Sequence, residues 1–126
     1  MSGGTIVTKA KNARGIYSYY SDNTAINFSG GSITTGDAGN IGLTSSIDHG
    51  EDGHGIYVYY SNNSNIAISG TSSITTYGHG ASGVYVVGDG SDTSLYANHT
   101  INMSGGTIIT KAKNARGIYS YYSDNT

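Results

Sequence analysis

The sequence predicts an all-β protein that winds as a β-solenoid, and three observations lead to this fold class. Residues 1–24 return almost unchanged as residues 103–126, with Val7 replaced by Ile109 as the single difference. The chain contains no proline, which cannot donate to a β ladder, and only 11% charged residues, which repel when like charges stack on adjacent strands. Fixed-period self-similarity is typical of repeat proteins in which each unit buries its apolar face against its neighbours.

The repeat divides the chain into two parts. Residue 1 matches residue 103, so the period is 102 residues. Residues 1–102 are one complete β-solenoid repeat unit, and residues 103–126 start the next copy. Two looser echoes of the same pattern begin at Ser29 and Ser69. Because the first methionine has a counterpart inside the chain, we expect the sequence to be an excerpt from a longer array.

Three short β-like segments recur along the chain, all rich in β-branched or aromatic residues and bounded by turn residues. The first segment occurs at Thr5–Thr8, Ser32–Thr35, Ser73–Thr76 and Thr107–Thr110. The second occurs at Ile16–Tyr20, Ile56–Tyr60, Val84–Gly88 and Ile118–Tyr122. The third occurs at Ala25–Phe28, Asn65–Ile68 and Thr100–Met103. Three segments per turn predict a three-faced coil with about three rungs per 102-residue repeat; five shorter rungs, with Ile41–Ile47 as an extra strand, are the alternative.

Equivalent positions of these segments carry aliphatic residues, which predicts columns of buried side chains. The expected core is Ile6, Ile16, Ile26, Ile33, Ile56, Ile66, Ile74, Val84, Ile101, Ile108 and Ile118. Side chains alternate between the two faces of a strand, so the neighbouring tyrosines are expected to point outward as a ladder on one flank. The ladder comprises Tyr17, Tyr19, Tyr57, Tyr59, Tyr85, Tyr119 and Tyr121. The opposite parity, with tyrosine inside, is the alternative.

Some of these segments resemble a known family. The motifs SITTG at Ser32–Gly36, GIY at Gly55–Tyr57 and SITT at Ser73–Thr76 are similar to the degenerate repeats of pertactin-like bacterial autotransporter passengers. The resemblance implies a right-handed parallel β-helix that is secreted across the outer membrane, lies at the cell surface and acts in adhesion. The chain departs from that family in its near-identical 102-residue repeat.

The charged residues concentrate in predicted turns. All six basic residues lie in two KAKNAR turns and form a basic edge: Lys9, Lys11, Arg14, Lys111, Lys113 and Arg116. An acidic, histidine-bearing turn is expected on the same edge. The pattern fits either charge-compensated solvated turns or a striped edge for anionic glycans. Two basic clusters are too sparse for nucleic-acid binding.

The acidic turn holds the candidate ligands for a metal ion, since carboxylates and imidazoles bind divalent cations. These candidates are Asp48, His49, Glu51, Asp52 and His54. Their spacing matches neither an EF-hand loop nor HExxH, so we predict no metal site and no cofactor. The chain also contains no cysteine, which excludes disulfides and cysteine metal sites.

Catalytic motifs are missing from the sequence. Every Asp and Glu lies in a predicted turn, whereas β-helical polysaccharide lyases and hydrolases need clustered carboxylates on a strand-borne face. The sequence carries no GxSxG or Walker loop. We therefore expect a protein that is not an enzyme. The tyrosine ladder fits sugar binding, because aromatic faces stack on sugars, or a purely structural role that shields the rungs.

The sequence thus predicts a structural and adhesive segment of an extracellular bacterial surface fibre, built from tandem β-solenoid repeats. Its expected partners are the rest of a longer repeat chain or copies of itself along the fibre axis, together with host or matrix glycans. No apolar run is long enough to span a membrane. A self-assembling filament of short chains stacked end to end and a polysaccharide-binding or polysaccharide-degrading β-helix are the alternatives.

Overall fold

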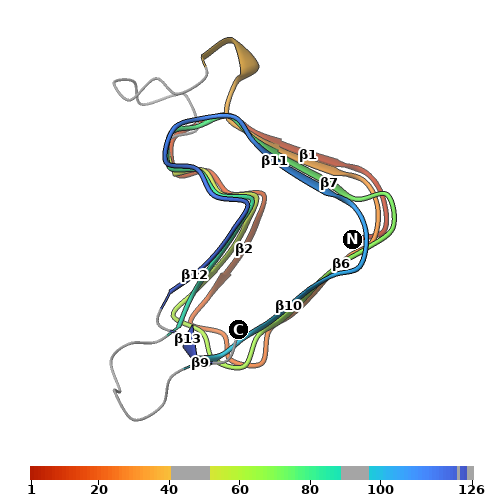
Figure 1. Cartoon of the computed structure of the whole chain (residues 1–126), viewed down its shortest axis with the longest axis vertical. Coiled ribbons are helices and arrows are strands. Elements are labelled where there is room, and N and C mark those ends of the chain that lie inside the picture. Colours follow the sequence, from red (N-terminus) through yellow and green to blue (C-terminus); the bar gives the residue numbers. More distant parts are fainter. Residues whose placement is uncertain (41–51, 89–96, 122, 125–126) are drawn as a thin grey trace.

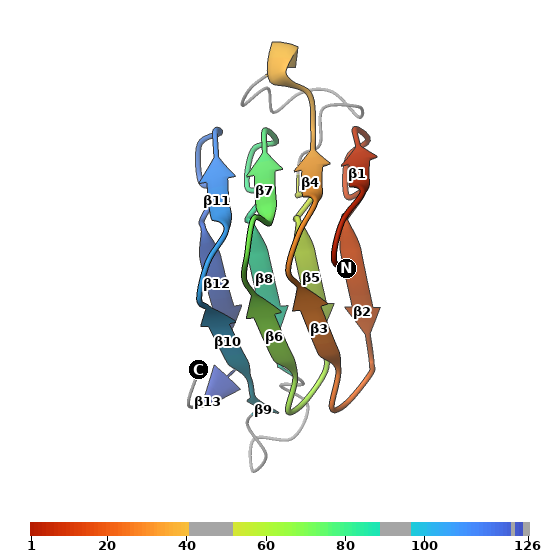
Figure 2. The same ribbon diagram turned by 90° about the vertical axis from the view of Figure 1, so that its right-hand side faces the viewer.

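A computed structural model describes residues 1–40, 52–88, 97–121 and 123–124 of the chain. The described residues form β-strands and connecting turns, with one turn of 3₁₀ helix, η1 (Ala38–Asn40). Every pair of neighbouring strands runs parallel. Figure 1 looks along the stack of strands, and Figure 2 shows the strands side by side. The predicted all-β class is confirmed, and the regular parallel stacking agrees with a β-solenoid.

The strands form three large sheets and one small one. The first sheet contains β1 (Thr5–Thr8), β4 (Ser32–Thr35), β7 (Ser73–Thr76) and β11 (Thr107–Thr110) in that order. The second contains β2 (Ile16–Tyr19), β5 (Ile56–Tyr59), β8 (Val84–Val87) and β12 (Ile118–Tyr121). The third contains β3 (Ala25–Phe28), β6 (Asn65–Ile68) and β10 (Thr100–Met103), and the small sheet pairs β9 (Ala97–Asn98) with β13 (Ser123–Asp124).

The order of the strands is the same in each large sheet and defines levels of the stack. The first level is β1, β2 and β3, the second is β4, β5 and β6, the third is β7, β8 and β10, and the fourth is β11 and β12. Within a sheet, equivalent residues lie directly beside one another. Ile33, for example, pairs with Ile6 on one side and Ile74 on the other.

The bounds of the strands in the three large sheets agree with the predicted segments except at the end of the second sheet's strands, and the short strands β9 and β13 were not predicted. Tyr20 and Tyr60 were expected to continue β2 and β5 but lie outside them. Their φ angles are 48° and 49°, in the left-handed region that interrupts an extended strand. The alternative extra strand at Ile41–Ile47 lies outside the described residues.

The core consists of the predicted aliphatic columns. Ile26, Ile33, Ile56, Ile66, Ile74 and Val84 are buried, and Phe28, Val58, Ile68 and Val86 pack with them. The outer members of the columns are partly buried against this cluster: Ile6, Ile16, Ile101 and Ile108. Ile118 was expected in the core but is 43% exposed. Its strand β12 has a neighbour, β8, on one side only, so nothing among the described residues covers its other side.

A column of threonines ties the first sheet to the turn that leads into the second. The hydroxyl Oγ1 of Thr8 donates to the carbonyl of Ala13 at 2.9 Å, and that of Thr76 donates to the carbonyl of Ala81 at 2.7 Å. Thr35 makes the equivalent bond to Gly53 on the second level. The turn is much longer on the second level than on the other two. The threonine therefore fixes where the chain re-enters the stack, whatever the length of the preceding turn.

The entry to the second sheet also requires glycine. A Cβ atom on Gly55 would lie 2.3 Å from Cγ2 of Ile74 and 2.6 Å from the carbonyl oxygen of Gly83, far inside van der Waals contact. Gly15 and Gly83 face the same obstruction on their own levels. This glycine column lets the first and second sheets approach closely.

The two ends of one column provide a matched test of the core. Ile56→Ala removes a fully buried side chain between two neighbouring strands, so it should destabilise the protein by about 2–5 kcal/mol. Ile118→Ala, at the equivalent position of β12, should cost about 1 kcal/mol because that side chain is half exposed. Urea unfolding followed by circular dichroism measures both. Equal losses in the two variants would contradict the assignment of the column.

Candidate functional site

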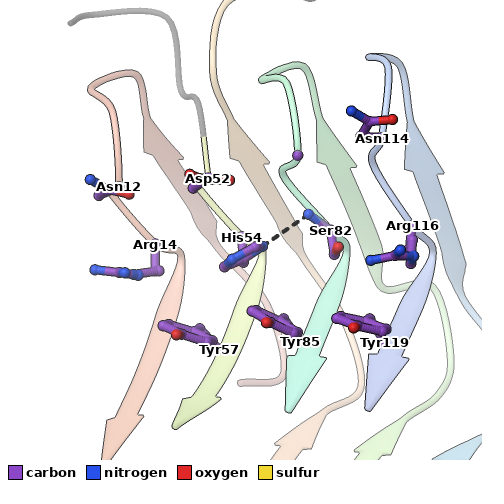
Figure 3. Close-up of a pocket in the computed structure, with 11 residues that line it drawn as sticks. Asn12, Arg14, Asp52, His54, Tyr57, Ser82, Tyr85, Asn114, Arg116 and Tyr119 are labelled. Carbon is purple, nitrogen blue, oxygen red and sulfur yellow. Dashed lines mark hydrogen bonds between the residues drawn. The ribbon is translucent and has the colours of Figure 1, made fainter. Parts of the chain in front are cut away.

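A polar groove of about 450 Å³ runs along the stack, lined by the turns between the first and second sheets and by the second sheet (Figure 3). Residues from all four levels line it: Asn12, Arg14, Asp52, His54, Tyr57, Gly80, Ser82, Tyr85, Asn114, Arg116 and Tyr119. The groove therefore crosses levels rather than belonging to one of them.

The lining residues form three rows parallel to the stack, as Figure 3 shows. The upper row is Asn12, Asp52 and Asn114, the middle row is Arg14, His54, Ser82 and Arg116, and the lower row is Tyr57, Tyr85 and Tyr119. Gly80 also lines the groove, and the backbone hydrogen bonds of its turn place it in the upper row on the third level. The upper row has φ angles of 58°, 51°, 71° and 61°, all left-handed, which Asn, Asp and Gly adopt more readily than other residues.

Backbone hydrogen bonds between levels continue through these turns and hold the rows in register. The amide of Asp52 donates to the carbonyl of His79 at 3.0 Å, and the amide of Gly80 donates to the carbonyl of Lys113 at 3.1 Å. The amide of Gly55 donates to the carbonyl of Ser82 at 3.0 Å. The hydrogen-bond ladder of the sheets thus extends past the strand ends into the turns. Equivalent residues of the groove wall therefore lie beside one another, as they do in the core.

The lower row belongs to an outward tyrosine ladder. The ring of Tyr17 lies 5.5 Å from that of Tyr57, Tyr57 lies 5.2 Å from Tyr85, and Tyr85 lies 4.9 Å from Tyr119, with interplanar angles of 8–13°. Val58 and Val86, which alternate with these tyrosines, are buried in the core. The rings face one another, so each interior ring offers a ligand its edge and hydroxyl rather than its face.

A second file of tyrosines on the same sheet is shorter. Tyr19 stacks on Tyr59 with 5.8 Å between ring centroids, but Val87 occupies the equivalent position on the third level. Tyr121 on the fourth level lies beside Tyr119, at 6.2 Å. Tyr17, Tyr19 and Tyr121 are each about half exposed, and none of this second file lines the groove.

The predicted basic edge separates into two kinds of residue. Lys9, Lys11, Lys111 and Lys113 are exposed and lie outside the groove. The arginines line the groove and lie on the tyrosine ladder: Cζ of Arg14 is 4.7 Å from the ring centre of Tyr57, and Cζ of Arg116 is 4.1 Å from that of Tyr119. Such cation–π contacts hold the guanidinium groups against the groove wall.

His54 is buried in the middle row and is neutral at neutral pH. Its Nδ1 accepts a hydrogen bond from the backbone amide of Ser82 at 3.0 Å, so the ring proton is on Nε2. Its ring lies 4.9 Å from that of Tyr57 and 4.5 Å from that of Tyr85. Burial, and secondarily the charge of Arg14, lowers the pKa of His54 from 6.5 to about 4. The same burial raises the pKa values of Tyr57 and Tyr85, so their hydroxyls stay protonated.

Part of the acidic turn can be placed. Asp48, His49 and Glu51 lie outside the described residues. Asp52 and His54 both line the groove, in the upper and middle rows respectively. Within the described ranges, no group of three or more His, Cys, Asp or Glu residues is positioned to hold a metal ion.

The groove also contains residues that no motif or charge pattern marks in the sequence, namely Asn12, Gly80, Ser82 and Asn114. An alignment of the four turns by sequence identifies these positions. The segments NARG at 12–15, DGHG at 52–55, GASG at 80–83 and NARG at 114–117 share a small second residue and a final glycine. This pattern marks the first and third positions of each segment as groove positions.

The comparisons with known proteins add no identification. No protein-family model, curated protein or solved structure matches this chain. In the part of the chain that the structure describes, no helix has the length and apolarity of a membrane span.

The state of His54 predicts an acid-dependent loss of stability. Its pKa is lower in the folded protein than in the unfolded chain, so the unfolded chain binds the extra proton as pH falls from 6.5 toward 4. The free energy of unfolding should be flat above about pH 7 and should decrease below it, by up to about 1.4 kcal/mol per pH unit for this one group.

Urea unfolding between pH 7.5 and 5 measures this slope. The buried His99, whose pKa burial also lowers, contributes in the same direction and serves as the internal background. His54→Asn should remove the contribution of His54 to the pH dependence of the free energy of unfolding, while the contribution of His99 remains. Parallel pH profiles for the parent protein and this variant would show that His54 is not a buried neutral base.

Proposed function

We propose that this chain is a structural and adhesive segment of an extracellular fibre, in which tandem repeats continue one right-handed parallel β-helix. The observation that carries the proposal is the stacking across the repeat boundary. Strands β11 and β12 belong to the second copy and pair with β7 and β8 without a change of register, Ile108 beside Ile74 and Ile118 beside Val84. The next copy therefore extends the existing sheets instead of starting a separate domain.

The figures support the right-handed sense of winding. In Figure 1 the chain runs counterclockwise from β1 through β2 toward the third sheet. Figure 2 places β11 on the side nearer to the viewer of Figure 1, and β1 on the far side. A counterclockwise path that advances toward the viewer is right-handed, which is also the hand that parallel crossovers strongly prefer.

The strand order supports three rungs per repeat. The first sheet contains β1, β4 and β7 before β11, which is the second copy of β1. Each repeat unit then contributes three strands to that sheet. With strands about 4.8 Å apart, one unit adds about 14–15 Å to the length of the fibre.

Electrostatics disfavour any stacking that places two KAKNAR turns on adjacent levels. If β1 of one molecule stacked on β11 of another, the two KAKNAR turns would become adjacent. Lys9 would then lie beside Lys111, and Arg14 beside Arg116, at a spacing of about 4.8 Å. Like charges directly opposite each other are destabilising. Within one chain, the levels of His54 and Ser82 separate the two arginines.

The surface location and the adhesive role rest on the resemblance of the SITT and GIY motifs to pertactin-like passengers. The groove supports adhesion more directly, because it places hydrogen-bonding side chains in a row along the fibre axis. Its partners would be the rest of a longer repeat chain and glycans of a host or matrix.

A concatemer of the 102-residue unit tests the fibre. Proteins that carry the present chain with one, three or six additional units should form rods of constant diameter that lengthen by about 14–15 Å per unit. Small-angle X-ray scattering gives the rod length and the cross-section separately. A matched series with Ile56→Asp and its equivalents should lose the linear growth, since an unpaired buried carboxylate opens the level. Scattering from the parent series that shows separate compact domains instead of one rod would contradict the proposal.

The groove also predicts an absence of glycan cleavage. Asp52 is the single carboxylate among the described residues that line it, whereas glycoside hydrolysis commonly uses a pair. Incubation with polygalacturonate should release no new reducing or unsaturated ends, and the parent and Asp52→Asn proteins should give the same blank result. Cleavage that Asp52→Asn abolishes would move the protein to the polysaccharide-degrading class.

A further inference from the structure

The middle row of the groove has its smallest side chain on the third level of the stack. In the middle row, Ser82 lies between the larger side chains of His54 and Arg116, as Figure 3 shows. In the upper row, Gly80 is the equivalent residue of the third level, and its amide donates to the carbonyl of Lys113 on the fourth level. A Cβ atom on Gly80 would lie 2.5 Å from Oδ1 of Asp52, so the Asp52 carboxylate already occupies the space beside this glycine. The open part of the groove on this level is therefore the place over Ser82, and we call it the pocket.

The pocket is bounded by groups of complementary chemistry. Arg116 closes one end, with its guanidinium on the ring of Tyr119. Within the described residues, neither Arg116 nor Arg14 pairs with a carboxylate. The hydroxyl-bearing edges of Tyr85 and Tyr119 form the lower wall, and Asp52 is an acceptor on the level of His54.

We propose that this groove binds a linear acidic polysaccharide, with one carboxylate-bearing sugar seated over Ser82 against Arg116. A planar guanidinium already held flat on an aromatic ring matches a carboxylate through two parallel hydrogen bonds. The sugar hydroxyls find donors in Ser82 and the tyrosine hydroxyls, and an acceptor in Asp52. An extended polymer fits because all three rows of the groove run parallel to the stack.

The spacing of the arginines favours a polymer over an isolated sugar. Arg14 and Arg116 lie in the same row on the first and fourth levels, so about 14–15 Å separates them along the axis. Within that row, His54 and Ser82 fill the interval with neutral hydrogen-bonding groups. The site needs only this chain, whereas its recurrence along a fibre, one arginine per 102-residue unit, rests on the proposed function. Recurrence would add avidity for a long glycan.

Isothermal titration calorimetry with hexagalacturonate tests the site on the intact chain. Arg116→Gln should weaken binding about tenfold or more, equivalent to about 1.4 kcal/mol. Arg116→Lys keeps the charge but loses the planar fork, and should also weaken binding, by about threefold or more. Ser82→Phe, which fills the pocket, should abolish it. Lys111→Gln removes one charge from the same turn outside the groove, and should change the affinity less than about twofold.

Several outcomes would overturn the site. These are no binding at millimolar ligand, equal losses in Lys111→Gln and Arg116→Gln, or undiminished affinity for the carboxyl-reduced hexasaccharide. Binding of hexaglutamate as tight as that of hexagalacturonate would also overturn it, because the groove would then recognise charge rather than sugar.

Two controls keep the result interpretable. Circular dichroism verifies the fold of each variant, and Arg116→Lys carries the test if Ser82→Phe does not fold. The rod length of the concatemers does not depend on Arg116. Absence of glycan binding together with normal rod growth would therefore refute the site but not the fibre. Glycan binding without rod growth would refute the fibre but not the site.

Discussion

Every level of this chain depends on the in-register parallel ladder, which places equivalent residues directly beside one another about 4.8 Å apart. Each column must then hold side chains that can pack against identical or similar side chains on the adjacent strands. Isoleucine and valine satisfy this condition inside, where Ile33 lies between Ile6 and Ile74, and tyrosine satisfies it outside as a file of facing rings. Proline would remove a donor from the ladder and is absent from the sequence.

The ladder also explains where the sequence can vary. Columns that set the geometry keep one residue type: a threonine hydroxyl bonds the turn on three levels, and a glycine admits the close approach of the sheets at Gly15, Gly55 and Gly83. The side chains of the middle row neither bond the turn nor need to be small for the sheets to approach, and this row contains arginine, histidine, serine and arginine. Chemical variety is thus concentrated where the fold imposes no identity, which is where a ligand would be recognised.

The sequence predicted the strands and the core well because both follow from local rules. Alternation decides which side of a strand is buried, and the repeat aligns Ile56 with Ile16 and Val84 without any three-dimensional information. The exposure of Ile118 was missed, because a column alone does not show that its last member lacks a covering strand. The groove was missed as well, since it joins four turns, one of them much longer than the other three, through left-handed residues such as Asn12 and through threonine hydrogen bonds. The sequence also did not show that stacking covers the tyrosine faces, because this depends on how the rings are oriented.

The register of the ladder is the central claim, and methyl contacts measured by nuclear magnetic resonance test it most directly. In a sample labelled at isoleucine δ1 methyls, Ile33 should show nuclear Overhauser contacts to Ile6 and to Ile74, and Ile74 should show one to Ile108. Ile6 and Ile74 should show none, because a strand lies between them. A slip of one residue would move a whole strand's side chains to the other face. A direct contact between Ile6 and Ile74, or the loss of the Ile33 contacts, would contradict the account.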